Sequence, residues 1–195
     1  MGVIKVVPNI LARATSINHD FISRLIKAGD RAVDATVGNG NDTLFLANLV
    51  GDSGKVYGFD IQEKAIEKTK ALLLEHNLDN RVSLIFDGHE NIEKYIQNPL
   101  KAIMFNLGYL PGGEHEIITK EETTIIALKK SLSLLTADGI LSVVVYSGHQ
   151  GGEREKQAVE VFFKTIPKNE FHVVKMHHLN RLESSPYIIM VQKNN

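Results

Sequence analysis

The sequence contains no cysteine among its 195 residues. This absence excludes disulfides, zinc–thiolate sites and cysteine nucleophiles, and it suits a reducing compartment. No apolar run approaches the roughly 18 residues that a membrane span needs. The first 16 residues also lack the apolar core and cleavage pattern of a secretory signal. We therefore expect a cytoplasmic protein that has no membrane partner.

The net charge of −1 hides an uneven distribution of charged side chains. Residues 1–27 carry four basic side chains against one acid, and residues 164–195 carry five against two, whereas residues 28–163 have an excess of seven acids. If the two ends meet in space, they form a basic rim that can face phosphates. Ordinary solvated termini are the simpler explanation of the same pattern.

Helical and strand periodicities alternate along the chain. The pattern predicts helices at 16–28, 41–50, 62–76, 89–97, 119–135 and 151–165, and strands at 31–36, 55–60, 81–86, 100–106, 140–147, 170–178 and 186–193. Such alternation is typical of a parallel sheet with helices on both faces, and the last two strands suit an antiparallel hairpin at one edge. We predict one α/β domain over 1–195, Rossmann-like and seven-stranded, with 1–28 as an N-terminal extension and helix. Ligands of such sheets bind at the carboxyl ends of the strands.

A glycine turn follows the first predicted strand. Gly38 and Gly40 allow the backbone to turn tightly and to approach a ligand. Asp34 precedes the turn and can accept a hydrogen bond from an ammonium group. Asp42 and Thr43 fall at the start of the next helix, where both residue types cap well. A plain strand–helix turn explains the same residues.

An acid follows the second strand. Asp60 lies 20 residues after Gly40, the distance at which nucleoside sites place a carboxylate on the ribose hydroxyls. Both bonds to the sugar would be charge-assisted. Asp60 can also cap the helix at 62–76. Together with the glycine turn, it predicts a ligand that contains adenosine.

Charge distinguishes two adenosine ligands. A nicotinamide dinucleotide carries a pyrophosphate that favours a helix start free of acids, and Asp42 would repel it. Thr43 also replaces the third small residue of the dinucleotide fingerprint. S-adenosylmethionine carries cationic sulfonium and ammonium groups, which Asp34 and Asp42 would attract. We therefore predict S-adenosylmethionine as cofactor, with S-adenosylhomocysteine as product and no metal.

Further polar groups follow the later strands. Asp87 can accept a hydrogen bond from the adenine amino group or cap the short helix after it. Asn106 offers two donors and an acceptor, and Tyr109 offers a flat ring, which suits a flat, amine-bearing target. A long surface loop is the alternative for 106–115. His149 can accept a proton or be a solvated turn residue.

The loop at 180–187, between the last two strands, is also polar. Arg181, Ser184 and Ser185 could hold a phosphate or a sugar. An ordinary hairpin loop is the alternative.

These strand ends share a pattern with a known family. VDATVGNGNDT (33–43), GFD (58–60), DGHE (87–90), NLGYLPGG (106–113), YSGHQGG (146–152) and SSPY (184–187) together resemble a bacterial family of class I methyltransferases. The family is described as rRNA methylases and includes MnmM, the tRNA 5-(aminomethyl)uridine methyltransferases that act at the wobble position. The resemblance implies the class I methyltransferase fold and a tRNA anticodon stem-loop as partner.

The resemblance also implies two pockets. The cofactor pocket would contain Asp34, Gly38, Asn39, Gly40, Asp42, Thr43, Asp60, Ile61, Gln62, Asp87, Gly88, His89 and Asn106. The acceptor pocket would contain Asn106, Leu107, Gly108, Tyr109, Tyr146, His149, Gly151, Gly152, Arg181, Ser184 and Ser185.

The expected reaction is in-line methyl transfer to the neutral aminomethyl amine of a 5-aminomethyl-(2-thio)uridine. Asn106 and the Leu107 carbonyl would orient the amine, Tyr109 would stack on the base, and His149 or a water would take the proton. A methyltransferase for ribosomal RNA or a small amine, a nicotinamide oxidoreductase and a non-catalytic cofactor-binding module are the alternatives. Apolar residues among the first seven could pack on the sheet or form a homodimer.

Overall fold

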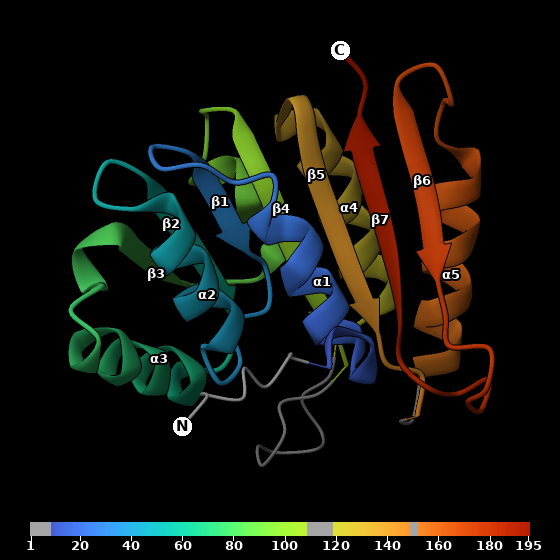
Figure 1. Ribbon diagram of the computed structural model, residues 1–195, viewed down its shortest axis with the longest axis horizontal. Helices are drawn as coiled ribbons and strands as arrows, with labels where there is room; N and C mark the ends of the chain where they lie inside the picture. The colour runs from blue at the N-terminus through green and yellow to red at the C-terminus, as the bar shows by residue number, and fades with distance from the viewer. Residues whose placement is uncertain (1–8, 109–118, 149–151) are drawn as a thin grey trace, which may run out of the picture.

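The centre of the structure, a computed structural model that describes residues 9–108, 119–148 and 152–195, is a seven-stranded sheet. The strand order is β3-β2-β1-β4-β5-β7-β6 (Figure 1). The strands are β1 Arg31–Asp34, β2 Lys55–Asp60, β3 Val82–Phe86, β4 Leu100–Leu107, β5 Leu135–Val145, β6 Phe171–Met176 and β7 Tyr187–Lys193. β1 to β5 are parallel, and β7 runs antiparallel to both β5 and β6. The predicted seven-stranded sheet with a C-terminal antiparallel hairpin is confirmed.

Helices cover both faces of the sheet. They are α1 Ala14–Ser23, α2 Asn41–Val50, α3 Glu63–Glu75, α4 Glu121–Leu134 and α5 Gly152–Thr165, with short 3₁₀ helices η1 Ile10–Ala12, η2 Asp79–Arg81 and η3 His89–Lys94. Apolar side chains of α1, α2 and α3 pack together on one face, and those of η3, α4 and α5 pack on the other. Figure 1 shows α1 and α2 in front of the sheet and α4 and α5 behind it. None of the helices within the described ranges is long and apolar enough to cross a membrane.

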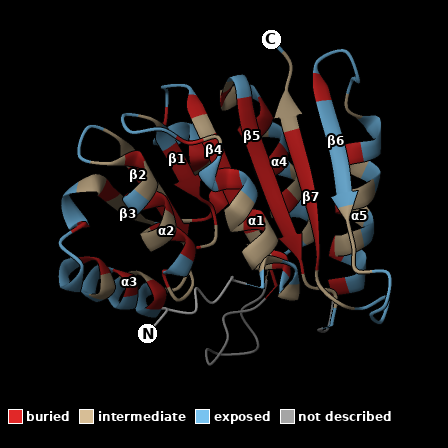
Figure 2. Cartoon of the chain, viewed as in Figure 1, coloured by how far each residue is buried: buried red, intermediate tan, exposed pale blue. Residues whose placement is uncertain are grey.

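The central strands are apolar because both of their faces are buried (Figure 2). Along β4, Ile103, Phe105 and Leu107 point to the α4–α5 face, whereas Ala102 and Met104 point to the α1–α2 face. This alternation is the period-two geometry of a strand covered on both sides. The buried centre holds the carboxyl ends of β1 and β4 side by side.

Three predicted elements differ most from the observed ones. The first helix ends at Ser23, because tighter hydrogen bonds, such as Leu25 N to Ile22 O at 3.0 Å, close its last turn. The predicted helix at 89–97 is the 3₁₀ helix η3. β5 begins at Leu135 and not at 140, and Asp138, which lies between the predicted helix and the predicted strand, takes a left-handed φ of 59° within it. There the register against β4 shifts.

Candidate active site

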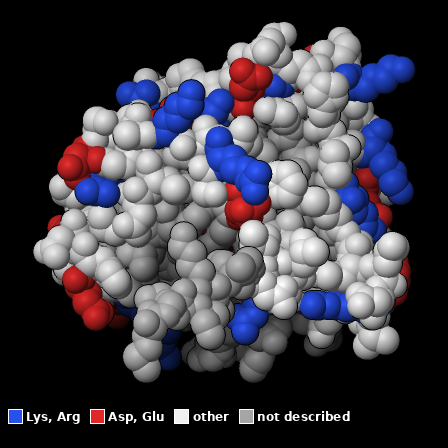
Figure 3. Space-filling view, viewed as in Figure 1, with Lys and Arg blue, Asp and Glu red and all other residues white. Residues whose placement is uncertain are grey.

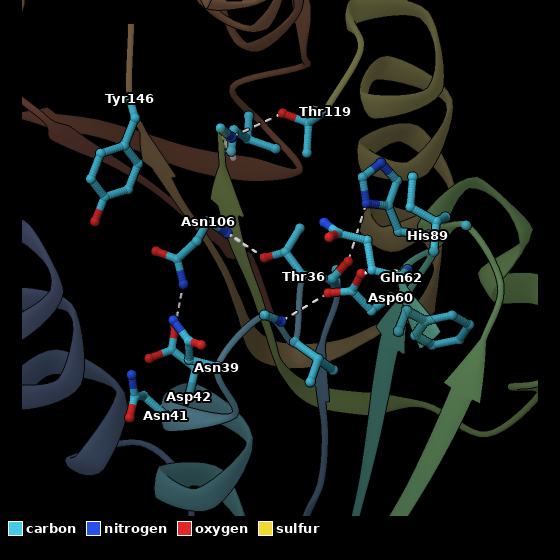
Figure 4. Close-up of a pocket in the computed structure, with 18 of the residues that line it drawn as sticks. Thr36, Asn39, Asn41, Asp42, Asp60, Gln62, His89, Asn106, Thr119 and Tyr146 are labelled. Atoms are coloured by element: carbon cyan, nitrogen blue, oxygen red, sulfur yellow. Dashed lines mark hydrogen bonds between the residues drawn. The ribbon is translucent and has the colours of Figure 1, made fainter. Parts of the chain in front are cut away.

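A cavity of about 830 Å³ lies at the carboxyl ends of β1, β2, β3 and β4. Its volume is within the range of small-molecule sites. The structure brings the following predicted residues to its wall: Gly38, Asn39, Asp42, Asp60, Ile61, Gln62, Asp87, Gly88, His89, Asn106, Leu107, Gly108 and Tyr146. Figure 4 shows how these side chains converge from separate strand ends. Reasoning from the strand ends therefore predicted half of the residues that line the cavity.

The turn after β1 requires glycine. Gly38 and Gly40 have φ values of 53° and 80°, in the left-handed region that glycine occupies without strain. A Cβ added at Gly40 would lie 2.6 Å from Thr69 Oγ1 on α3. The missing side chain therefore lets the turn pack closely against α3.

Asp60 ties this glycine turn to the end of β2. Its Oδ2 accepts a hydrogen bond from Gly38 N at 2.8 Å, and its Oδ1 accepts one from Gln62 N at 2.9 Å. Burial raises the pKa of Asp60, although these bonds oppose the shift. A carboxylate has about four acceptor positions, more than these bonds occupy.

Asp42 and Asn106 form a polar pair in the cavity wall. Asn106 Nδ2 donates to Asp42 Oδ2, and His19 Nε2 lies 2.6 Å from Asp42 Oδ1 (Figure 4 labels Asn106 and Asp42). The pair determines the orientation of the amide, because a carboxylate only accepts hydrogen bonds and the NH₂ group must face it. Asn106 Oδ1 is buried and has no hydrogen-bond partner among the described residues. Unpaired buried acceptors of this kind are rare in folded proteins.

The prediction that Asp42 and Thr43 cap α2 is wrong. The N-cap of α2 is Gly40, and no side chain caps this helix. Thr43 Oγ1 instead donates to Asp34 Oδ2 at 2.6 Å. Thr43 is thus bound to Asp34, and Asp42 is bound to Asn106 and His19, so neither side chain is available to the helix start.

Asp34 does not line the cavity and is fully buried beneath it. It accepts hydrogen bonds from Thr43 Oγ1 and from Thr36 N, the latter at 3.1 Å. The structure therefore does not place Asp34 where it would contact an ammonium group, and Asp42 is the acid at that wall. Burial, together with the charge of Asp42, raises the pKa of Asp34 to about 7.

Replacing Asp34 with asparagine should flatten the pH dependence of stability. Between about pH 4 and pH 7 the wild-type native state keeps a proton that the unfolded chain loses, so its stability falls as pH rises. The slope is at most about 1.4 kcal/mol per pH unit. Asparagine can donate to Thr43 and accept from Thr36 without ionising. We expect urea unfolding at pH 5, 6, 7 and 8 to show that the free energy of unfolding of the variant, relative to that of the wild type, increases as pH rises. Parallel profiles would contradict the raised pKa.

His89 and Asp87 form the wall beyond β3. His89 Nδ1 lies 3.1 Å from Ala35 O, so this nitrogen carries the hydrogen, and burial lowers the pKa of His89. Asp87 accepts hydrogen bonds from Gly88 N, Asn91 Nδ2 and Tyr95 OH at 2.7–2.8 Å. Although burial opposes them, these bonds lower the pKa of Asp87, which keeps it ionised at neutral pH.

The structure does not bring all residues of the predicted acceptor pocket to the cavity. The Leu107 carbonyl accepts Tyr146 N at 3.2 Å, so the sheet already uses the carbonyl that we expected to orient an amine. Arg181 donates to Ala12 O at 2.7 Å, and none of Arg181, Ser184, Ser185 and Gly152 lines the cavity. Tyr109, His149 and Gly151 lie outside the described residues.

Sequence reasoning missed one side of the cavity. Arg13, Thr15, Ser16 and His19 of α1 and its N-cap, with Thr119, Lys120 and Thr123 around the start of α4, also line it. α1 precedes the first strand, so a search of strand ends does not reach it. The signal that could have found it is the cluster of polar residues in the first two turns of α1, which includes Thr15, Ser16 and His19. Across the described ranges, no three His, Asp or Glu side chains gather in a way that could hold a metal ion.

Comparison with known proteins identifies the family. The sequence model of the family described as "Putative rRNA methylase" matches residues 56–192. The chain belongs to this rRNA methylase family. The membership confirms the predicted resemblance and removes the nicotinamide oxidoreductase from the alternatives.

Individual members agree with this assignment. An Arabidopsis thaliana protein named tRNA (mnm(5)s(2)U34)-methyltransferase, chloroplastic, is 37% identical over 94% of this chain and 70% of its own length. A crystal structure described as that of a "putative rRNA-methylase" from Clostridium thermocellum is 49% identical over 93% of this chain and 97% of that one, with a TM-score of 0.91. A Streptococcus mutans protein described as "a putative methyltransferase" and solved in complex with SAH is 42% identical over 93% of this chain and 98% of that one, with a TM-score of 0.85. The fold of this chain is therefore that of the class I methyltransferases.

Proposed function

We propose that this protein transfers a methyl group from S-adenosylmethionine to the primary amine of a 5-aminomethyl-(2-thio)uridine at the wobble position of tRNA. The observation that carries the proposal is Asn106, whose Oδ1 is a buried acceptor without a partner among the described residues. The name of the Arabidopsis relative supports the tRNA substrate, and the SAH complex of the Streptococcus relative supports the cofactor.

The cavity wall fits the cofactor. Asp60 has acceptor positions left for the ribose hydroxyls, and the glycine turn lets the backbone approach closely. Asp42 supplies negative charge for the ammonium group in place of Asp34. Asp87 and Gly88 line the same cavity, and we assign them to the adenine amino group. These acids would disfavour a pyrophosphate at the same place.

The side chains of this protein have mainly an orienting role in the reaction. S-adenosylmethionine, when bound, supplies an electrophilic methyl group on its sulfonium sulfur. Asn106 Oδ1 accepts one N–H of the amine and points the nitrogen lone pair along the line of transfer. The new N–C bond forms as the C–S bond breaks, and the surplus proton leaves the amine to water. Alignment of bound reactants can supply several kcal/mol of the barrier, up to roughly 7–11 in ideal cases.

The two basic ends of the chain meet beside the cavity. His178 Nε2 lies 2.6 Å from Leu11 O, and Arg181 bonds Ala12 O, so the β6–β7 loop lies against η1. Arg13, next along the chain, lines the cavity. Figure 3 shows basic side chains interspersed with acids over the α1 side of the molecule, where Arg24 pairs with Asp20 at 2.9 Å. We propose this junction of the two ends as a place for tRNA phosphates. The cytoplasmic location and the homodimer stay predictions from sequence.

The deciding assay mixes the protein and methyl-labelled cofactor with tRNA that lacks the final wobble methyl group. Nucleoside analysis should show label only in 5-methylaminomethyl-(2-thio)uridine. Fully modified tRNA is the matched control and should accept none. Label in ribosomal RNA but not in this tRNA would replace the proposed substrate with a ribosomal one, and label in no RNA would refute an RNA methyltransferase.

A further inference from the structure

Glu155 is a buried acid that the proposed reaction does not use. It lies in the first turn of α5, and only 3% of it is exposed. It does not line the cavity. Burying a carboxylate costs several kcal/mol, and an apolar side chain would fill the same space without that cost. Its presence therefore calls for a specific role.

Each oxygen of this carboxylate accepts a hydrogen bond from a threonine hydroxyl. Thr124 Oγ1 donates to Oε1 at 2.6 Å, and Thr119 Oγ1 donates to Oε2 at 2.7 Å. A hydroxyl has one proton, so the donation to Glu155 leaves the oxygen of Thr119 as an acceptor. That oxygen accepts Gly108 N at 3.0 Å. Glu155 thus determines which way the Thr119 hydroxyl points, and with it the bond to Gly108.

The peptide between Leu107 and Gly108 is held at both ends. Its carbonyl accepts Tyr146 N, and its N–H donates to Thr119. Thr119 N also donates to Gly108 O at 3.0 Å. On the other side of this peptide is Asn106, whose own N–H donates to Thr36 Oγ1 at 2.7 Å. Thr36 therefore holds the backbone at Asn106, and bonds that end on the buried Glu155 carboxylate hold it two residues further on, at Gly108.

We infer that Glu155 is a positioning residue for methyl transfer, which acts through Thr119 and Gly108 to hold Asn106 Oδ1 at the acceptor amine. This role rests on the proposed function, and it assigns to the buried carboxylate a part in alignment rather than in cofactor binding. A displacement of about 1 Å at reacting groups can lower a rate about 100-fold.

The test compares two isosteric replacements. Thr119→Val removes the acceptor of Gly108 N, whereas Thr124→Val removes only the other bond to Glu155. We expect Thr119→Val and Glu155→Leu to lower kcat about 10- to 100-fold, with the Kd for S-adenosylhomocysteine changed less than about threefold. Thr119→Ser and Thr124→Val should keep kcat within about threefold. Thermal unfolding measures whether the Thr119→Val and Thr124→Val variants are destabilised to the same extent.

Amide hydrogen exchange at Gly108 gives a readout without substrate. Thr119→Val and Glu155→Leu should lose the protection of this amide, and Thr124→Val should keep it. Equal losses of kcat in the two valine variants, or unchanged protection of Gly108 in Thr119→Val, would overturn the inference. If the wild type methylated no RNA, the proposed function would fail, and the exchange data would still decide whether Glu155 holds Gly108.

Discussion

Replacing Asn106 with alanine is expected to lower kcat for methyl transfer about 100-fold or more, with little change in cofactor affinity. The amide is held by Asp42, and its free oxygen is the acceptor we assign to the amine. Alanine removes that acceptor, so the amine loses both its hydrogen bond and its alignment. Single-turnover kinetics with saturating cofactor and tRNA measure the loss.

Two further variants sharpen the Asn106 test. Asn106→Asp keeps the shape of the side chain, but it loses the donor and places a second acid against Asp42, so it should be as inactive as alanine. Asn48→Ala, on the exposed side of α2, is the control and should keep full turnover. Wild-type turnover in Asn106→Ala would remove this residue from the mechanism.

Replacing Asp60 with alanine is expected to raise the Kd of S-adenosylhomocysteine about 100-fold or more. Two charge-assisted hydrogen bonds to the ribose, each contributing about 1.5–3 kcal/mol, would be lost. The glycine turn would also lose its tether, because Gly38 N donates to this carboxylate. Titration calorimetry measures the change.

The Asp60 test has its own comparison. Asp60→Asn keeps an acceptor for the backbone but loses the charge, so its Kd should lie between those of the wild type and the alanine variant. Asp52→Ala removes an acid whose side chain is 84% exposed and which pairs with Arg81, and it should bind as the wild type does. Unchanged affinity in Asp60→Ala would refute the ribose contact.

Reasoning from strand ends found groups that the sheet brings together, but it could not assign their partners. Asp34 and Asp42 looked equivalent in the sequence, since both flank the glycine turn. Depth in the fold separates them: Asp34 is fully buried and held by Thr43, while Asp42 faces the cavity. The sequence predicted Arg181 as a phosphate ligand, but its guanidinium donates a hydrogen bond to the backbone of η1.

The sequence by itself determined the order of strands and helices, the closing hairpin and the family, because side-chain periodicity and short motifs are local properties of the chain. Tertiary structure alone decided which polar groups meet. His19 and Asp42 are 23 residues apart, Thr119 and Glu155 are 36 apart, and Asn106 and Asp42 are 64 apart. Pairs at such separations depend on how helices pack across the sheet, and no local pattern encodes that packing.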